Sequence, residues 1–219
     1  MVRSILAPLF LVATLSLSAS AQGSKVETIG AFADQGASES VRSALEAKGY
    51  RVTAGDGTVV CEIWLRNGVP IQPKKDISGA IYSELGDSTM IGVVSLQKGG
   101  YDYRGQGIKA GVYTLRYALH PSDGNHMGIS TYRDFLLLVP LTSDPDVNAK
   151  FKFEELSKIS AKAAGTNHPT PFSLVSPEGG KAAPSVSENE HGHLVFAAKL
   201  KTQGGEMPIA FVVKGIAEQ

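Results

Sequence analysis

The residues best suited to bind a ligand lie in one polar stretch, from Pro121 to Asp134, and at the end of the segment before it. The candidate ligand-binding residues are Arg116, His120, Asp123, Asn125, His126, Arg133 and Asp134. They offer carboxylates, an amide, imidazoles and guanidinium groups. Because a long loop between regular elements commonly carries function or disorder, we expect the ligand site there. The alternative is a loop that its own hydrogen bonds hold together, with a turn at Asp123-Gly124.

Histidines supply a second candidate chemistry, which is metal binding. His191 and His193 are one residue apart, so an extended chain directs both rings to the same side. His120 and His126 could add imidazole ligands of the kind that divalent transition metals take. The alternative is a pair of solvated histidines at the start of a strand. We predict no cofactor, keep a divalent transition metal as the alternative, and expect His126 to lie too far from the pair to share an ion with it.

Motifs that would mark an enzyme are missing from the sequence. It has no Gly-x-Ser-x-Gly nucleophile motif, no His-Glu-x-x-His zinc motif and no phosphate-binding motif that ends in Gly-Lys. The sequence therefore favours a non-catalytic protein over an enzyme. A sugar-binding aromatic surface is a further alternative, although packing is the commoner role for its candidates, which are Trp64, Tyr101, Tyr103 and Tyr132.

Charge and composition exclude two classes of partner. The basic and acidic residues number 21 each, so the formal net charge is +0. A protein that binds nucleic acid neutralises phosphates with an excess of basic residues, and one that binds a membrane surface clusters them. We therefore expect neither a nucleic-acid partner nor stable insertion into a membrane. The expected partner is a small molecule of unknown identity, a glycan or a protein of the cell envelope.

The N-terminus has the three parts of a secretory signal peptide. Arg3 is followed by the apolar run from Ile5 to Leu17, and the small residues Ala19 and Ala21 come just before Gln22. A segment of this kind is removed after export. We expect residues 1–21 to be the signal peptide and residues 22–219 to form a single domain that is secreted or periplasmic.

Short segments of β type must position the candidate residues. Alternating residues with turn signals between them predict strands at 50–53, 58–66, 80–85, 89–96, 111–120, 134–141, 172–175, 193–202 and 208–216. Capping residues and helical spacing predict helices over 38–48 and 152–164. Residues 24–37 and 176–189 are expected to be loops.

Many short strands with one or two short helices indicate a mainly β fold. Helices are too few to cover a doubly wound parallel sheet, so we expect an antiparallel β-sandwich of jelly-roll or immunoglobulin-like type. Cys61, the only cysteine, falls on the apolar face of a predicted strand and is expected to be a core thiol. The expected function is that of an exported, non-catalytic binding or accessory module of the cell envelope. The alternative is a metal-binding protein or a metal-assisted enzyme that uses loop histidines.

Overall fold

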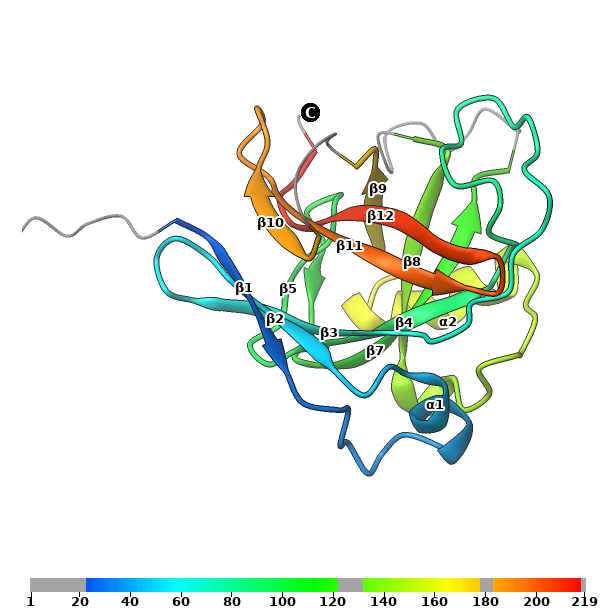
Figure 1. Ribbon diagram of the computed structural model, residues 1–219, viewed down its shortest axis with the longest axis horizontal. Coiled ribbons are helices and arrows are strands. Elements are labelled where there is room, and N and C mark those ends of the chain that lie inside the picture. Colours follow the sequence, from blue (N-terminus) through cyan, green and yellow to red (C-terminus); the bar gives the residue numbers. More distant parts are fainter. Residues whose placement is uncertain (1–22, 122–131, 178–182, 218–219) are drawn as a thin grey trace, which may run out of the picture.

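The computed structural model describes residues 23–121, 132–177 and 183–217. The expected signal peptide lies outside these residues. Within them the fold is mainly β, with the helices α1 (Glu39–Ala44) and α2 (Phe153–Ala164) and the short 3-10 helix η1 (Leu141–Ser143) (Figure 1). Neither of the two α-helices in this part of the chain has the length and apolar character that crossing a membrane requires.

Most strands belong to one antiparallel sheet. Across the described sheet the order is β1 (Lys25–Ile29), β2 (Gly49–Thr53), β3 (Val59–Leu65), β4 (Met90–Leu96), β7 (Gly111–Leu119), β8 (Asp134–Pro140), β9 (Pro171–Val175), β12 (Gly205–Lys214), β11 (Leu194–Thr202) and β10 (Ser185–Glu188). The first and last strands, β1 and β10, contact each other, so the sheet is nearly barrel-shaped. A separate hairpin joins β5 (Gly100–Tyr101) to β6 (Gly107–Ile108).

The two faces of the sheet bury different sets of side chains. Successive residues of a strand point to opposite faces, so on β7 Leu115 and Tyr117 point into the main core, whereas Ala118 points outward. The helix α2 covers Ala118 and its neighbours on β8. The helix α1 covers a third cluster, which includes Trp64 of β3. The helices thus cover parts of the outer face, and the curled sheet encloses the main core.

Local sequence explains where the helices begin and end. The Ser38 side chain accepts a hydrogen bond from the Val41 backbone N–H, which caps α1. The helix α2 ends at Gly165, whose φ of 73° lies in the left-handed region. Both helices are therefore confirmed, although α1 ends at Ala44, before its predicted boundary.

The structure confirms the prediction of a mainly β protein with an antiparallel sheet. The predicted strand over residues 80–85 is wrong, because these residues form turns that pack over one end of the sheet. The predicted loops over 24–37 and 176–189 contain β1 and β10, which are edge strands. An edge strand can remain polar because one of its sides is open to water.

The curled sheet has a closed end and an open end. A closing segment, residues 67–89, runs across the closed end, where Val69, Tyr82 and Leu85 join the main core. The backbone N–H of Val69 donates to the carbonyl of Lys201, and that of Ser88 donates to the carbonyl of Tyr117. The open end is formed by the β2–β3 turn, the β5–β6 hairpin, the β10–β11 turn and the residues after β12 (Figure 1).

Cys61 lies in the main core, as predicted. Its exposed fraction is 1%, and its neighbours are the apolar side chains that β3 shares with the adjacent strands. Burial raises the pKa of the thiol, with a smaller contribution from the charge of Glu62. Cys61 is therefore held as a neutral thiol, which suits packing and not nucleophilic attack.

Candidate functional site

A cavity of about 450 Å³ opens at the open end of the sheet. Its deepest lining residues are Leu96, Ile108, Phe172 and Val213, which are all at most 5% exposed and belong to the main core. These side chains come from β4, β6, β9 and β12. The cavity is therefore an extension of the core that the side chains of the described residues do not fill.

Two exposed apolar side chains stand at the mouth of this cavity. Tyr101 is 62% exposed and Ile216 is 45% exposed, and both line the cavity. Among the described residues, the third large hydrophobic side chain with comparable exposure is Ile71, which belongs to the closing segment. Exposed apolar groups beside an apolar cavity are typical of a ligand-binding site.

Glycines allow the chain to turn tightly around the mouth. Gly99, between β4 and β5, has a φ of 72°, and a Cβ atom there would lie 2.4 Å from the carbonyl oxygen of Ile108. Gly215, after β12, has a φ of 148°, and a Cβ atom there would lie 2.3 Å from the His193 ring. Only glycine fits either position without displacing its neighbour.

The residues after β12 are held across the mouth by two contacts. The Nε2 atom of His193 lies 2.8 Å from the carbonyl oxygen of Ile216. One residue further on, the Ala217 backbone N–H donates to the carbonyl of Tyr103 at 2.8 Å. The His193 ring is only 5% exposed and meets the Tyr103 ring edge to face. The exposed side chain of Ile216 is thus presented by a fixed backbone.

Among the described residues, the charged side chains that line the cavity are basic. They are Lys98, which follows β4, and Lys214, which ends β12. Three acids lie nearby, but none of them lines the cavity. Asp56 has a lowered pKa, chiefly because the Thr58 backbone N–H donates to it and less because of the charge of Lys214. Glu190 lies 3.5 Å from Nε2 of His191, and Glu188 is close to the same turn.

Arg116, predicted to bind a ligand, lies fully buried on the outer face of the sheet. It forms a two-pronged ion pair with Asp144, with distances of 2.6 Å from Nε to Oδ2 and 2.7 Å from Nη2 to Oδ1. Its remaining N–H groups donate to the carbonyl oxygens of Ser88, Asp146 and Ala149. Arg116 therefore fixes the segment between β8 and α2, away from the cavity.

Three further predicted residues lie at the closed end. The Oδ2 atom of Asp134 accepts hydrogen bonds from the backbone N–H groups of Ile81 and Tyr82 at 3.0 and 2.7 Å. The Nε atom of Arg133 donates to the carbonyl oxygen of His120 at 3.0 Å. The His120 ring packs on that of Phe135, with 4.5 Å between ring centres. These residues hold the closing segment, and Asp123, Asn125 and His126 lie outside the described residues.

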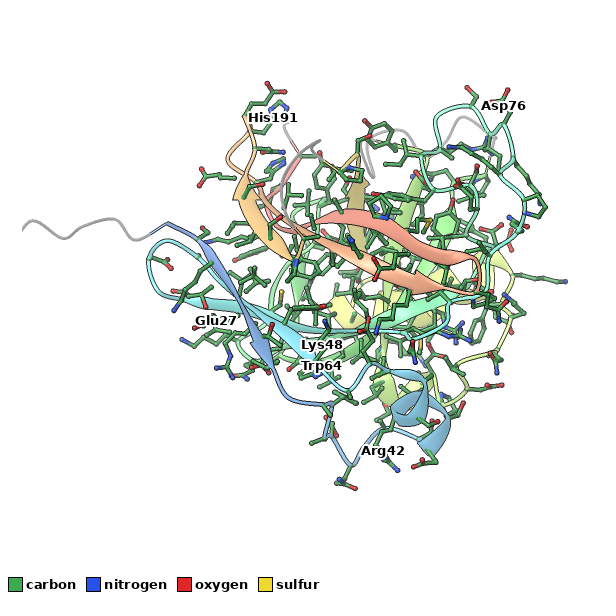
Figure 2. The ribbon with its side chains drawn as sticks, viewed as in Figure 1. Glu27, Arg42, Lys48, Trp64, Asp76 and His191 are labelled. Carbon is green, nitrogen blue, oxygen red and sulfur yellow. The ribbon has the colours of Figure 1, made fainter. Side chains whose placement is uncertain are left out.

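The structure separates the histidines that were proposed as metal ligands. His191 and His193 lie together at the open end, with 5.7 Å between ring centres, whereas His120 lies at the closed end. Figure 2 shows His191, on the β10–β11 turn, left of the middle along the upper edge of the view, and Asp76, on the closing segment, at its upper right. Within residues 23–121, 132–177 and 183–217, no three His, Cys, Asp or Glu side chains gather as metal ligands would.

Among the aromatic candidates for a sugar-binding surface, Trp64 lies apart from Tyr101 and Tyr103, which are both at the open end. Trp64 is 7% exposed, packs edge to face on Phe32 and donates its indole N–H to the carbonyl of Gly30 at 2.9 Å. Trp64 therefore belongs to the cluster beneath α1. Tyr101 lies at the mouth of the cavity, where its ring is exposed.

Sequence reasoning missed the cavity because its lining comes from segments far apart in the chain. A weak signal was present. Glycines follow strand ends at Gly99, Gly192 and Gly215, and a lysine stands next to the first and the last of them. Only the topology shows that these three strand ends meet at the same end of the sheet.

Comparison with known proteins leaves the function open. No protein-family model matches the chain, and neither a curated protein nor a solved structure matches it. The function must therefore be argued from the cavity and the side chains around it.

Proposed function

We propose that this protein is an exported, non-catalytic binding module that takes an apolar small molecule into the cavity at the open end. The observation that carries the proposal is an unfilled space of about 450 Å³ that is continuous with the main core. Pockets for small molecules usually measure about 300–1,000 Å³ and are mostly apolar. A secreted or periplasmic location, as the N-terminal sequence predicts, is part of the proposal.

The energetics of such a site favour an apolar ligand. Each methylene group that leaves water for an apolar site contributes about 0.8 kcal/mol. The walls are strands with buried side chains, among them Leu96 and Phe172, so few groups must become ordered when the ligand enters. A preformed apolar cavity of this kind needs few polar contacts for binding, and this supports a binding role over a catalytic one.

The arrangement of strands supports the predicted sandwich as the finer description of the fold. The strand β9 pairs with both β8 and β12. It therefore joins one group of strands, β1 to β8 of the main sheet, to a second group, β12, β11 and β10. We propose that these groups act as the two layers of a β-sandwich, with the cavity between the layers at the open end.

A neutral fluorescent probe tests the proposed function. N-phenyl-1-naphthylamine should bind the wild-type protein saturably, with a rise in fluorescence when it enters the apolar cavity. Gly100→Trp should weaken that binding about tenfold or more, since the new ring adds bulk to the lining. A Cβ atom at Gly100 has no neighbour within 4 Å, so the variant should fold.

Gly107→Trp is the matched control. Gly107 pairs with Tyr101 in the same hairpin, also has open space around a Cβ atom, and does not line the cavity. Gly107→Trp should bind the probe as the wild type does. Both tryptophan variants should have melting temperatures close to that of the wild type. The proposal is wrong if the wild type shows no saturable binding, or if folded Gly100→Trp binds as tightly as Gly107→Trp.

A further inference from the structure

We infer that the ligand is an amphiphile with an anionic head group, with its apolar chain in the cavity and its head between Lys98 and Lys214. This inference rests on the proposed function and specifies the ligand of the same site. It follows from the change in chemistry along the cavity, from buried apolar side chains such as Phe172 to the exposed lysines Lys98 and Lys214.

The two lysines reach the mouth from separate parts of the sheet. Lys98 follows β4 and Lys214 ends β12, and three strands, β7, β8 and β9, lie between them in the sheet order. Both lysines line the same cavity, so one ligand that fills it can meet side chains from both parts of the sheet. On this inference, a carboxylate or phosphate at its outer end accepts charge-assisted hydrogen bonds from the two ammonium groups.

The ammonium groups are available to such a head group. Neither Lys98 nor Lys214 forms a salt bridge with any of the described residues. The charge of Lys214 acts on Asp56, which forms no salt bridge with it, and the Asp56 carboxylate accepts the backbone N–H of Thr58 at 2.8 Å. Glu190 lies beside His191. Among the described residues no carboxylate lines the cavity, so a cationic head group would meet the like charges of Lys98 and Lys214 there.

The apolar part of the ligand must be a chain or ring system without charges. The lining below the lysines is aliphatic and aromatic, with Leu96, Ile108 and Val213 around Phe172. For single-chain ligands we expect the affinity to rise about fourfold per added methylene until the cavity is full. A short water-soluble anion such as acetate should bind at least about a hundredfold more weakly than a twelve-carbon analogue.

Displacement of N-phenyl-1-naphthylamine by three twelve-carbon compounds tests the inference. These are dodecanoate, dodecyl phosphate and the neutral dodecanol. At low salt, the wild type should bind at least one of the anions about tenfold more tightly than the alcohol. Tighter binding of the carboxylate or of the phosphate identifies which anion the site prefers, and either result supports the inference.

Two double variants separate a local contact from an effect of net charge. Lys98→Gln with Lys214→Gln should remove the preference for the anions and leave dodecanol binding unchanged. Lys158→Gln with Lys162→Gln on α2 changes the net charge equally but alters no residue of the cavity lining, so it should keep the preference. All of these substitutions replace exposed side chains, so the variants should fold.

The outcomes distinguish the two proposals. If the alcohol and the anions displace the probe equally, and the Lys98/Lys214 variant changes neither, the inference about the head group is wrong and the apolar site stands. If the probe binds but the α2 variant loses the preference as fully as the Lys98/Lys214 variant, the preference is a net-charge effect and the inference is also wrong. If neither the probe nor any twelve-carbon compound binds the wild type, the proposed function itself is wrong.

Discussion

At the closed end of the sheet the Asp134 carboxylate and the Tyr82 hydroxyl are buried and hydrogen-bonded, whereas at the open end apolar groups line a space that the described side chains do not fill. At the closed end, Asp134 accepts backbone hydrogen bonds from the closing segment. The Tyr82 hydroxyl donates to the carbonyl of Val175 and accepts a hydrogen bond from the N–H of Ala210. At the open end, Tyr101 and Ile216 are exposed beside the cavity.

The difference follows from what each group needs when it leaves water. A buried polar group requires a partner, so the closed end is specified by directional bonds that fix one conformation. An apolar group requires only an apolar neighbour, which a ligand can supply as well as the chain. We therefore expect substitutions at the closed end to reduce stability and substitutions at the open end to change binding.

The largest effect should come from removing the carboxylate at the closed end. Asp134→Ala leaves the N–H groups of Ile81 and Tyr82 and the hydroxyl of Tyr117 without this acceptor. Each buried group that loses its partner costs about 1–3 kcal/mol, so we expect a loss of about 3–5 kcal/mol. Urea unfolding of the purified protein measures the loss.

Asp56→Ala provides the comparison at the open end. Asp56 also accepts a backbone N–H, that of Thr58, but it is exposed to water, so its replacement should leave the unfolding free energy close to that of the wild type. Should Asp134→Ala fail to fold, Asp134→Asn keeps one acceptor oxygen and should show an intermediate loss. Equal losses for Asp134→Ala and Asp56→Ala would contradict the contrast between the two ends.

The sequence predicted the elements whose pattern is complete within one segment. On β7, the alternation of Tyr113, Leu115 and Tyr117 predicts both the strand and the face of it that points into the main core. Gly165 gives the end of α2. By contrast, β1 and β10 are polar edge strands that are each hydrogen-bonded to one neighbour, so only the fold shows that they are strands.

The sequence could not predict the site, because polarity alone does not tell a binding residue from a structural one. Arg116 and Asp134 were selected for their charge, yet both are fully buried and bonded within the chain. Asp144, the partner of Arg116, lies 28 residues further along the chain, and no local pattern connects the two. The cavity was missed for the complementary reason, since its walls consist of ordinary core residues such as Leu96 and Phe172.

A smaller effect should come from one hydroxyl group at the closed end. Tyr82→Phe leaves the carbonyl of Val175 and the N–H of Ala210 without their shared partner and should cost about 1–3 kcal/mol of unfolding free energy. The same change at the open end, Tyr101→Phe, removes an exposed hydroxyl. The unfolding free energy of this variant should be within about 0.5 kcal/mol of the wild-type value. Thermal and urea unfolding of both variants measure the difference, and a larger loss for Tyr101→Phe would reverse our assignment of the two ends.

The last prediction asks whether the cavity lets water into the core beneath it. Cys61 lies on β3 two residues from Val59, which lines the cavity, and burial raises the pKa of its thiol above the ordinary value of 9.0. Above that value the thiol ionises in the unfolded chain but stays neutral in the folded protein. The unfolded state is therefore favoured as the pH rises, and the contribution of this group to stability is fully present only below the unfolded pKa.

The expected size of this effect follows from the same pKa difference. Between about pH 8 and about pH 10, the wild type should lose about 1.4 kcal/mol more unfolding free energy than Cys61→Ala, which has no thiol to ionise. Urea unfolding of both proteins at the two pH values measures the difference, and the tyrosines that also titrate cancel between them. If the two proteins lose stability equally, the thiol ionises in the folded state as it does in the unfolded chain. Water would then reach β3 through the open end, and the cavity could not be the dry apolar site that the proposed ligand requires.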